Sequence, residues 1–558
     1  MSNSAAPGPG FKTPLEMFYQ WEAQMPDQTW LRHFSGGAWV GITWAAAGAL
    51  ARRLAAGIQA MGLEKGDKLG IFATNSPEWI ISDIASMMAG MVTVPIYTTM
   101  PMDKVKYVAE HSDMRAVIVG SGICLEVLRS ELPSGVLIVG LPGVDSSATD
   151  QHWDSLISQN APLDGNPLRD PQDLWTIVYT SGTTGMPKGV MHSFATLPYS
   201  ASAIPIYTGA NEQGRLFSYL PLAHVAERVL VELQSIYSGA SIGFNGSKDS
   251  FTDDLREVRP TFFLAVPRIW TNLKTGIVAQ MGNEAWQKLL ENPERSAEIG
   301  KSVLASMGLE AVSFAFSGAA PIAADDIRAW RALGMPLYEG FGQSEMMSGT
   351  LNVPGKDKIG SVGCCFTQFG GELSISNIGE ILLRAPGAMV GYYKEPEKTK
   401  EAFLDGWVRT GDKGRIDEDG FLFITGRVKE IFKTAKGKYV APGPIEKLFE
   451  VSPHVDQLCL VGSGRPQTLM LVNMTAASAT IAKELVTREL EQQRQRVNDN
   501  LEAHERISHV IICAEPWTME NRLLTHTLKI LRDDVEKNHQ PSIESCMQGA
   551  SGTTVVWE

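Results

Sequence analysis

Cysteine is scarce in this sequence, and the few cysteines present form no pattern. None sits in a C-x-x-C pair, so neither a disulfide framework nor a zinc knuckle is indicated. The six cysteines are Cys124, Cys364, Cys365, Cys459, Cys513 and Cys546. A chain of this kind suits a reducing compartment, and we expect it to be cytoplasmic.

Long apolar runs are also missing. The best candidate for a membrane span, residues 80–97, is interrupted by Asp83 and Pro95, so we interpret it as a buried helix followed by a core strand. Residues 1–10 contain no basic residue and no apolar run typical of a signal peptide. The sequence therefore predicts no transmembrane segment, and it leaves peripheral membrane contact and homodimer formation undecided.

Positive charge is in deficit as well. The chain has 49 Lys and Arg against 62 Asp and Glu, which gives a net charge of -13. Such a balance works against binding nucleic acid through its phosphates, so we expect no nucleic-acid partner. An anionic substrate would have to be bound by local donors.

The chain does have length and apolar content. Its 558 residues exceed what one hydrophobic core usually organises, so we expect at least two domains. After Thr43, a candidate helix cap, Leu50, Leu54 and Ile58 recur at helical spacing. Short apolar runs typical of buried strands occur at residues 69–73, 92–97, 116–119, 174–179 and 261–266. This alternation predicts an α/β fold with mainly parallel sheets.

The pattern changes from Gly379 onward, where short strands and polar turns indicate a β-rich subdomain. Residues 481–507 are predicted to form a charged helix, flanked by strands at 458–461, 469–472 and 510–513. We therefore expect a large N-terminal domain over residues 1–426 and a small, mobile α+β C-terminal domain over residues 427–558.

The most informative segment follows the strand at 174–179. It reads Thr180-Ser-Gly-Thr-Thr-Gly-Met-Pro-Lys188-Gly189, a run of hydroxyls and glycines closed by a lysine. Backbone N–H groups, hydroxyls and one cation can together surround phosphate oxygens. The segment departs from the P-loop pattern, because Gly189 stands where Ser or Thr should hold magnesium. The alternative is a flexible surface turn.

This loop closely resembles the signature loop of the adenylate-forming superfamily of acyl-CoA synthetases, luciferases and adenylation domains. The resemblance extends over roughly residues 30–532, with several further motifs in the family's order. The segments Tyr219-Leu-Pro-Leu-Ala-His224 and Ala265-Val-Pro-Arg268 look most like the long-chain fatty acyl-CoA synthetase branch.

The resemblance implies an ATP site built from the loop and from later motifs. The implied residues are Thr180, Ser181, Gly182, Thr183, Thr184, Gly185, Lys188, Ser317, Gly318, Ala319, Tyr338, Glu339, Gly340, Ser344, Asp412, Arg427 and Lys529. Within this set Tyr338 would pack on adenine, and Asp412 would accept both ribose hydroxyls, which suits a carboxylate with two acceptor oxygens. Taken singly, Tyr338 is more typical of a core residue, and a lone Thr-Gly-Asp is more typical of a turn.

The resemblance also implies catalytic roles for Lys529, Glu345, Ser344, Lys188 and His224. Glu345 would hold Mg²⁺, and His224 would line the acyl pocket, although a single histidine more often has a structural role. Lys429 would be the pivot of an interdomain hinge, and Gly437 and Lys438 would line the coenzyme A channel. The plainer interpretation of the hinge segment is a β-turn.

The expected chemistry has two steps. A carboxylate, which we expect to be that of a medium- to long-chain fatty acid, attacks MgATP to give an acyl-adenylate and pyrophosphate, and coenzyme A then takes the acyl group and releases AMP. The protein must position two anions and neutralise developing charge. Two alternatives are an adenylate-forming relative with another acid or outcome, such as a β-lactone synthetase, and a noncatalytic nucleotide or lipid binder.

Overall fold

The computed structural model describes most of the chain and divides it into two compact units. The described residues are 11–180, 186–347, 349–449, 454–475, 478, 481–525, 529–548 and 553–558. Unit 1 comprises Met1–Ala320, Ile327–Leu373 and Leu383–Arg409, and unit 2 comprises Pro321–Asp326, Ser374–Leu382 and Thr410–Glu558.

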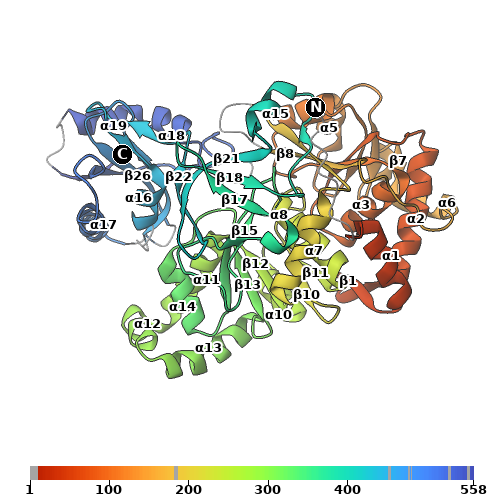
Figure 1. Ribbon diagram of the computed structural model, residues 1–558, viewed down its shortest axis with the longest axis horizontal. Helices are drawn as coiled ribbons and strands as arrows, with labels where there is room; N and C mark the ends of the chain where they lie inside the picture. Colours follow the sequence, from red (N-terminus) through yellow and green to blue (C-terminus); the bar gives the residue numbers. More distant parts are fainter. Residues whose placement is uncertain are drawn as a thin grey trace. The chain divides into compact units, whose positions relative to one another are not determined.

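Unit 1 contains two large sheets, whose strands can be followed in Figure 1. The first has the order β19 (Gly391–Tyr392), β9 (Lys188–Ser193), β8 (Leu174–Thr180), β4 (Val92–Pro95), β3 (Lys68–Phe72), β5 (Met114–Val119), β6 (Leu137–Gly140) and β7 (Gln151–His152). From β8 to β7 every pairing is parallel, whereas β9 and β19 are antiparallel additions.

The second sheet has nine strands. Their order is β16 (Cys364–Cys365), β15 (Thr350–Leu351), β14 (Leu337–Phe341), β13 (Phe314–Ser317), β12 (Phe262–Ala265), β10 (Arg215–Ser218), β11 (Ser241–Phe244), β1 (Thr29–Ser35) and β2 (Ala38–Thr43). The pairings from β14 to β1 are parallel. The predicted α/β class with mainly parallel sheets is confirmed.

The helices of unit 1 begin and end where local chemistry favours it. Helix α2 (Trp44–Ala60) starts after Thr43, whose hydroxyl accepts a hydrogen bond from the Ala46 N–H, as the sequence predicts. Helix α3 (Pro77–Ala89) is capped by Ser76 and ends at Gly90, whose φ of 85° is unfavourable for other residues. Every residue of α3 except Glu78 is buried, which confirms a core helix at this position.

The core of unit 1 lies between the sheets and their covering helices. Helix α1 (Pro14–Gln24) packs on α2, and α2 packs on α3; the three lie side by side in Figure 1. Their contact is rich in aromatic side chains: Trp30 and Trp44 stack with ring centroids 4.2 Å apart, and Phe18 lies 5.4 Å from Trp30.

Unit 2 begins within a β-rich region and continues into a small α+β sheet. Strands β21 (Trp407–Ile416) and β22 (Leu422–Arg427) form an antiparallel hairpin, and β23 (Phe432–Lys433) pairs with β24 (Tyr439–Val440). A further sheet has the order β25 (Val455–Val461), β26 (Thr468–Met474), β27 (Ile507–Ile512) and β28 (Val555–Trp557). Helices α16 (Pro442–Phe449), α17 (Lys483–Asn498), α18 (Arg532–Asn538) and α19 (Gln540–Met547) complete this part.

The predicted helix over residues 481–507 is too long, because α17 ends at Asn498. The Asn498 side chain donates to the Ile507 carbonyl at 2.9 Å and accepts from the Ile507 N–H at 2.8 Å, which fixes the turn that follows the helix. Leu501 keeps helical spacing in the sequence but packs on the core from this turn. Among the described helices of both units, none is long and apolar enough to cross a membrane.

Candidate active site

The two ends of the predicted phosphate loop are held together by the β8–β9 hairpin. Thr180, the last residue of β8, is the cross-strand partner of Lys188, the first residue of β9. The intervening predicted residues Ser181, Gly182, Thr183, Thr184 and Gly185 lie outside the described residues. The pairing of β8 with β9 therefore brings the two ends of the predicted loop side by side.

Lys188 and Glu345 are brought together by a residue to which the sequence assigned no role. The Lys188 ammonium lies 4.7 Å from the centroid of the Tyr392 ring, and the Tyr392 hydroxyl donates to Glu345 Oε1 at 2.7 Å. Burial and the adjacent carboxylate raise the pKa of Tyr392 above its usual range, so it remains a donor. The only signal for Tyr392 in the sequence was its place in the Gly-Tyr-Tyr segment.

Ser344 is fixed by a buried histidine. His192 on β9 places its Nε2 2.7 Å from the Ser344 carbonyl oxygen, so that nitrogen carries the proton and donates. Burial lowers the pKa of His192 to about 4, which keeps the ring neutral. The backbone of the next residue is held as well, since the Glu345 carbonyl accepts from the Met389 N–H at 2.8 Å.

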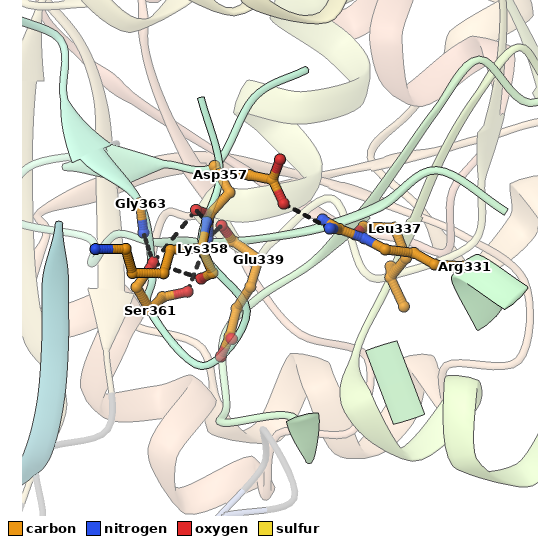
Figure 2. Close-up of polar contacts among 8 residues, drawn as sticks. Arg331, Leu337, Glu339, Asp357, Lys358, Ser361 and Gly363 are labelled. Atoms are coloured by element: carbon orange, nitrogen blue, oxygen red, sulfur yellow. Dashed lines mark hydrogen bonds and ion pairs between the residues drawn. The ribbon is translucent and has the colours of Figure 1, made fainter. Parts of the chain in front are cut away.

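Strand β14, which carries Tyr338, Glu339 and Gly340, rests on a loop braced by polar contacts (Figure 2). Asn352 Nδ2 donates to the carbonyls of Glu339 and Ser361, at 3.1 and 2.7 Å. The Lys358 N–H donates to Asn352 Oδ1 at 3.0 Å. The loop therefore fixes the strand from which the Ser344–Glu345 turn departs.

An arginine holds the first residue of β14. Arg331 donates to the Leu337 carbonyl at 3.0 Å and forms an ion pair with Asp357 at 2.5 Å (Figure 2). Its guanidinium also lies 4.9 Å from the Tyr338 ring centroid, and that ring stacks on Phe314 at 4.7 Å. Tyr338 is thus already packed by protein groups.

The predicted adenine turn has a strained backbone. Ser317 is the buried last residue of β13, and Ala319 adopts a φ of 65°, which non-glycine residues rarely do. A Cβ on residue 318 would lie only 2.5 Å from the Phe316 ring, so a larger residue than Gly318 would force that ring to move. Strain of this kind is frequent at ligand sites.

His224 caps helix α8 (Val225–Glu227): its Nδ1 accepts from the Ala226 N–H at 3.1 Å. The preceding loop is pinned by Asn75, which donates to the Leu220 carbonyl at 2.6 Å and accepts from the Leu222 N–H at 3.0 Å. Glu227 Oε1 accepts from the Ser218 hydroxyl at 2.8 Å.

Glu227 lies next to a fully buried charge cluster. Arg228 pairs with Asp83 at 2.5 Å and with Glu232 at 2.9 Å, and its guanidinium lies 3.7 Å from the Trp175 ring centroid. Burial raises the pKa of Glu232, while the adjacent Arg228 guanidinium opposes that rise.

In unit 2 the predicted ribose residue Asp412 and a second predicted ATP-site residue, Arg427, are cross-strand neighbours. Asp412 on β21 faces Arg427 on β22, with Arg427 Nε 3.1 Å from Asp412 Oδ1. Burial raises the pKa of Asp412, while Arg427 and then Lys529 lower it, so Lys529 is within electrostatic reach. Glu380, which the sequence did not single out, accepts from the Gly411 N–H at 3.1 Å and supports this turn.

The other predicted residues of unit 2 lie on turns. Lys429 is in the turn that directly follows β22. Gly437, with a φ of 76°, and Lys438 belong to the turn of the β23–β24 hairpin. Lys529 is exposed, and its N–H donates to the Thr525 hydroxyl at 3.0 Å.

The described residues contain one group with the spacing of metal ligands, Cys513, His539 and Glu558. Trp517 Nε1 donates to His539 Nε2 at 3.0 Å, so the ring proton resides on Nδ1, which donates to Glu558 at 2.9 Å. A metal at Nδ1 would move that proton to Nε2, where it would face the indole donor. This group is better described as a Trp–His–Glu hydrogen-bond relay.

Comparison with known proteins places this geometry in a family. Residues 18–393 match the AMP-binding enzyme family, and residues 429–551 match the AMP-binding enzyme C-terminal domain. The chain therefore belongs to the AMP-binding enzymes, the adenylate-forming class that its motifs indicate.

Two curated relatives match nearly the whole chain. Fatty acyl-CoA synthetase A of Dictyostelium discoideum is 30% identical, over 89% of this chain and 84% of the relative. Long-chain-fatty-acid–CoA ligase FadD15 of Mycobacterium tuberculosis is 29% identical, over 95% of this chain and 96% of the relative. The predicted resemblance to the fatty acyl-CoA synthetase branch is confirmed.

A solved structure has the same fold. The adenylation domain of carboxylic acid reductase from Segniliparus rugosus, in complex with AMP and a co-purified carboxylic acid, aligns with a TM-score of 0.78. The alignment covers 97% of this chain and 94% of that one, at 20% identity.

Proposed function

We propose that this protein activates a long-chain fatty acid: it couples the acid to ATP, releases pyrophosphate, and passes the acyl group from the adenylate to coenzyme A. The observation that carries the proposal is the near full-length similarity to a fatty acyl-CoA synthetase and to a long-chain-fatty-acid–CoA ligase. The position of Lys188, Tyr392 and Glu345 at one site supports it.

In the first step the protein needs to position two anions rather than supply a nucleophile. Lys188 and Lys529 would neutralise charge on the phosphates, and the Ser344 hydroxyl would contact the α-phosphate. Glu345 suits a divalent ion, because among the described residues the only donor to its carboxylate is Tyr392, which contacts one of the two oxygens. Magnesium bound there would supply further charge neutralisation.

Further residues would hold the nucleoside. Asp412 keeps one carboxylate oxygen on Arg427 and has a second oxygen for the ribose hydroxyls. Ser317, Gly318 and Ala319 would lie against adenine. The aromatic partner of adenine would be Tyr338 or, because Tyr338 already contacts Phe314 and Arg331, the half-buried Phe341 at the end of the same strand.

The second step would use the small domain. We assign residues 427–558 to it, with Lys429 as the pivot and with Gly437 and Lys438 along the coenzyme A path. His224, whose Nδ1 caps a helix, would border the reacting carboxylate. None of the six cysteines, all of which lie among the described residues, forms a disulfide, which supports activity in the reducing cytoplasm.

The test is a panel of acids, from acetate to stearate and including benzoate, assayed for pyrophosphate, AMP and thioester with and without coenzyme A. We expect long-chain acids to give AMP and acyl-CoA in equal amounts. A product formed without coenzyme A would indicate a different adenylate-forming reaction, and absence of acid-dependent pyrophosphate release would refute the proposal.

A further inference from the structure

Tyr392 occupies an unusual position between two side chains of opposite charge. It lies on β19, which pairs with β9 so that Tyr392 is opposite Val190, two residues after Lys188. Only 7% of its surface is exposed. Its N–H donates to the Thr399 hydroxyl at 2.8 Å, so both the backbone and the ring of Tyr392 are fixed.

The ring offers a different group to each neighbour. The Lys188 ammonium lies against the ring, where the electron-rich face attracts a cation, and the hydroxyl at the ring edge donates to Glu345. In the part of the chain that the structure describes, Lys188 and Glu345 form no ion pair with each other. The Tyr392 side chain therefore contacts both charges, one at its ring face and the other at its hydroxyl.

The Glu345 carboxylate is consequently held in one orientation. Its backbone carbonyl is tied to Met389, and its Oε1 is tied to Tyr392, three residues further on. Oε2 accepts no hydrogen bond from a described residue. A carboxylate with one oxygen anchored and one uncommitted is prepared to bind a hard cation, since partners behind a ligand fix its direction.

We propose that Tyr392 is a positioning residue for the divalent ion of the reaction: its hydroxyl orients Glu345 toward the metal, and its ring keeps Lys188 away from that carboxylate. This rests on the proposed function, in which Glu345 is a metal ligand. Tyr392 does not touch the reacting atoms, so it acts through its two neighbours.

The test measures metal binding without turnover. Free Mn²⁺ is followed by electron paramagnetic resonance as it is titrated into full-length protein and ATP with no fatty acid present. Tyr392→Phe keeps the ring and removes only the hydroxyl, and we expect it to weaken Mn²⁺ binding about tenfold. Binding of ATP in EDTA, measured by calorimetry, should stay unchanged.

The chain offers a matched control in the neighbouring residue. Tyr393→Phe removes a hydroxyl that contacts Asp113 at 3.0 Å, and it should leave Mn²⁺ binding at the parent level. A merely structural tyrosine at 392 would instead alter ATP binding in EDTA or alter neither measurement, and either result overturns the proposal.

A third variant separates this proposal from the assignment of Glu345. If Tyr392 acts through Glu345, then Glu345→Gln weakens Mn²⁺ binding and adding Tyr392→Phe weakens it little further. If Tyr392→Phe weakens Mn²⁺ binding equally in the parent protein and in the Glu345→Gln variant, the proposed role of Tyr392 is overturned, while the assignment of Glu345 stands. No effect of Glu345→Gln overturns the metal assignment in the proposed function, and the role of Tyr392 with it.

Discussion

Arg427 and Asp412 face each other across β22 and β21, with Arg427 Nε 3.1 Å from Asp412 Oδ1. The residue proposed to bind ribose is therefore anchored by the residue that precedes the proposed hinge. One carboxylate oxygen is held by the guanidinium, so the orientation of the other is set before ATP arrives.

This arrangement predicts the effect of Asp412→Ala. Two ribose hydroxyls would lose their acceptor, and Arg427 would lose its partner, so the KM for ATP should rise by the equivalent of about 1–3 kcal/mol. Steady-state kinetics with varied ATP measure it. Asp419→Ala, at the exposed turn of the same hairpin, is the control and should behave like the parent. An unchanged KM in the Asp412 variant would refute the ribose assignment.

The sequence predicted local features of the fold well. The strand at 174–179 and the helix after Thr43 have short-range signals, namely apolar runs and a capping hydroxyl, and both are confirmed. The end of α17 was missed, because Leu501 continued the apolar spacing past the point where the Asn498 side chain turns the chain.

Long-range partners in the site could not be predicted in the same way. Tyr392 is 47 residues from Glu345, and no local pattern couples a tyrosine to a distant carboxylate. Glu380 likewise resembles any strand residue until the fold places it against the Gly411 N–H. Motifs identify the candidate site residues, whereas the residues that hold them in place are determined by tertiary packing.

A pair of variants on β14 can identify the aromatic partner of adenine. Phe341→Ala should raise the KM for ATP about tenfold, the equivalent of roughly 1.4 kcal/mol, because it removes a half-exposed ring next to the Ser344–Glu345 turn. Tyr338→Ala should mainly lower the urea midpoint, since its ring packs on Phe314 and Arg331. If Tyr338→Ala raises the KM for ATP and Phe341→Ala lowers only the urea midpoint, Tyr338 is the aromatic partner of adenine.

Glu227 predicts a pH dependence of stability. Burial raises its pKa to about 8, whereas in the unfolded chain the same carboxyl ionises near its ordinary pKa of 4.5. At a pH between these two pKa values Glu227 takes up a proton when the chain folds. The free energy of unfolding therefore falls as pH rises, by at most about 1.4 kcal/mol per pH unit. Glu227→Gln keeps an oxygen acceptor for Ser218 and cannot ionise. Urea unfolding from pH 5 to 8 should show a flatter profile for this variant; parallel profiles would contradict the prediction.

Arg532 should be a determinant of stability in unit 2. It forms a two-pronged ion pair with Glu446, at 2.5 and 3.0 Å, and donates to the Leu460 carbonyl at 2.7 Å. Removing one partner of a largely buried pair strands the other charge, so Arg532→Ala should cost roughly 3 kcal/mol. Arg532→Lys should recover only part of this stability, because an ammonium cannot donate to both Glu446 oxygens as the planar guanidinium does. The urea midpoint is the measurement, with Arg496→Ala on exposed α17 surface as the control.

Lys529 allows the two half-reactions to be separated. Burial raises the pKa of Asp412 and the Lys529 ammonium opposes that rise, so Lys529 is within electrostatic reach of the proposed ribose residue; its side chain is exposed. A lysine that neutralises phosphate charge only at the adenylation transition state should contribute several kcal/mol to that step alone. Lys529→Ala should therefore abolish most acid-dependent pyrophosphate release.

The same Lys529→Ala protein should still convert presynthesised acyl-adenylate and coenzyme A to thioester at near the parent rate, because that step does not use the lysine. Lys529→Arg keeps the charge but changes its shape, and it should rescue adenylation poorly. Loss of both half-reactions would point to a misfolded small domain, which a urea midpoint equal to that of the parent would exclude. Normal pyrophosphate release by the alanine variant would reject Lys529 and direct attention to the lysines of the β23–β24 segment, Lys433, Lys436 and Lys438.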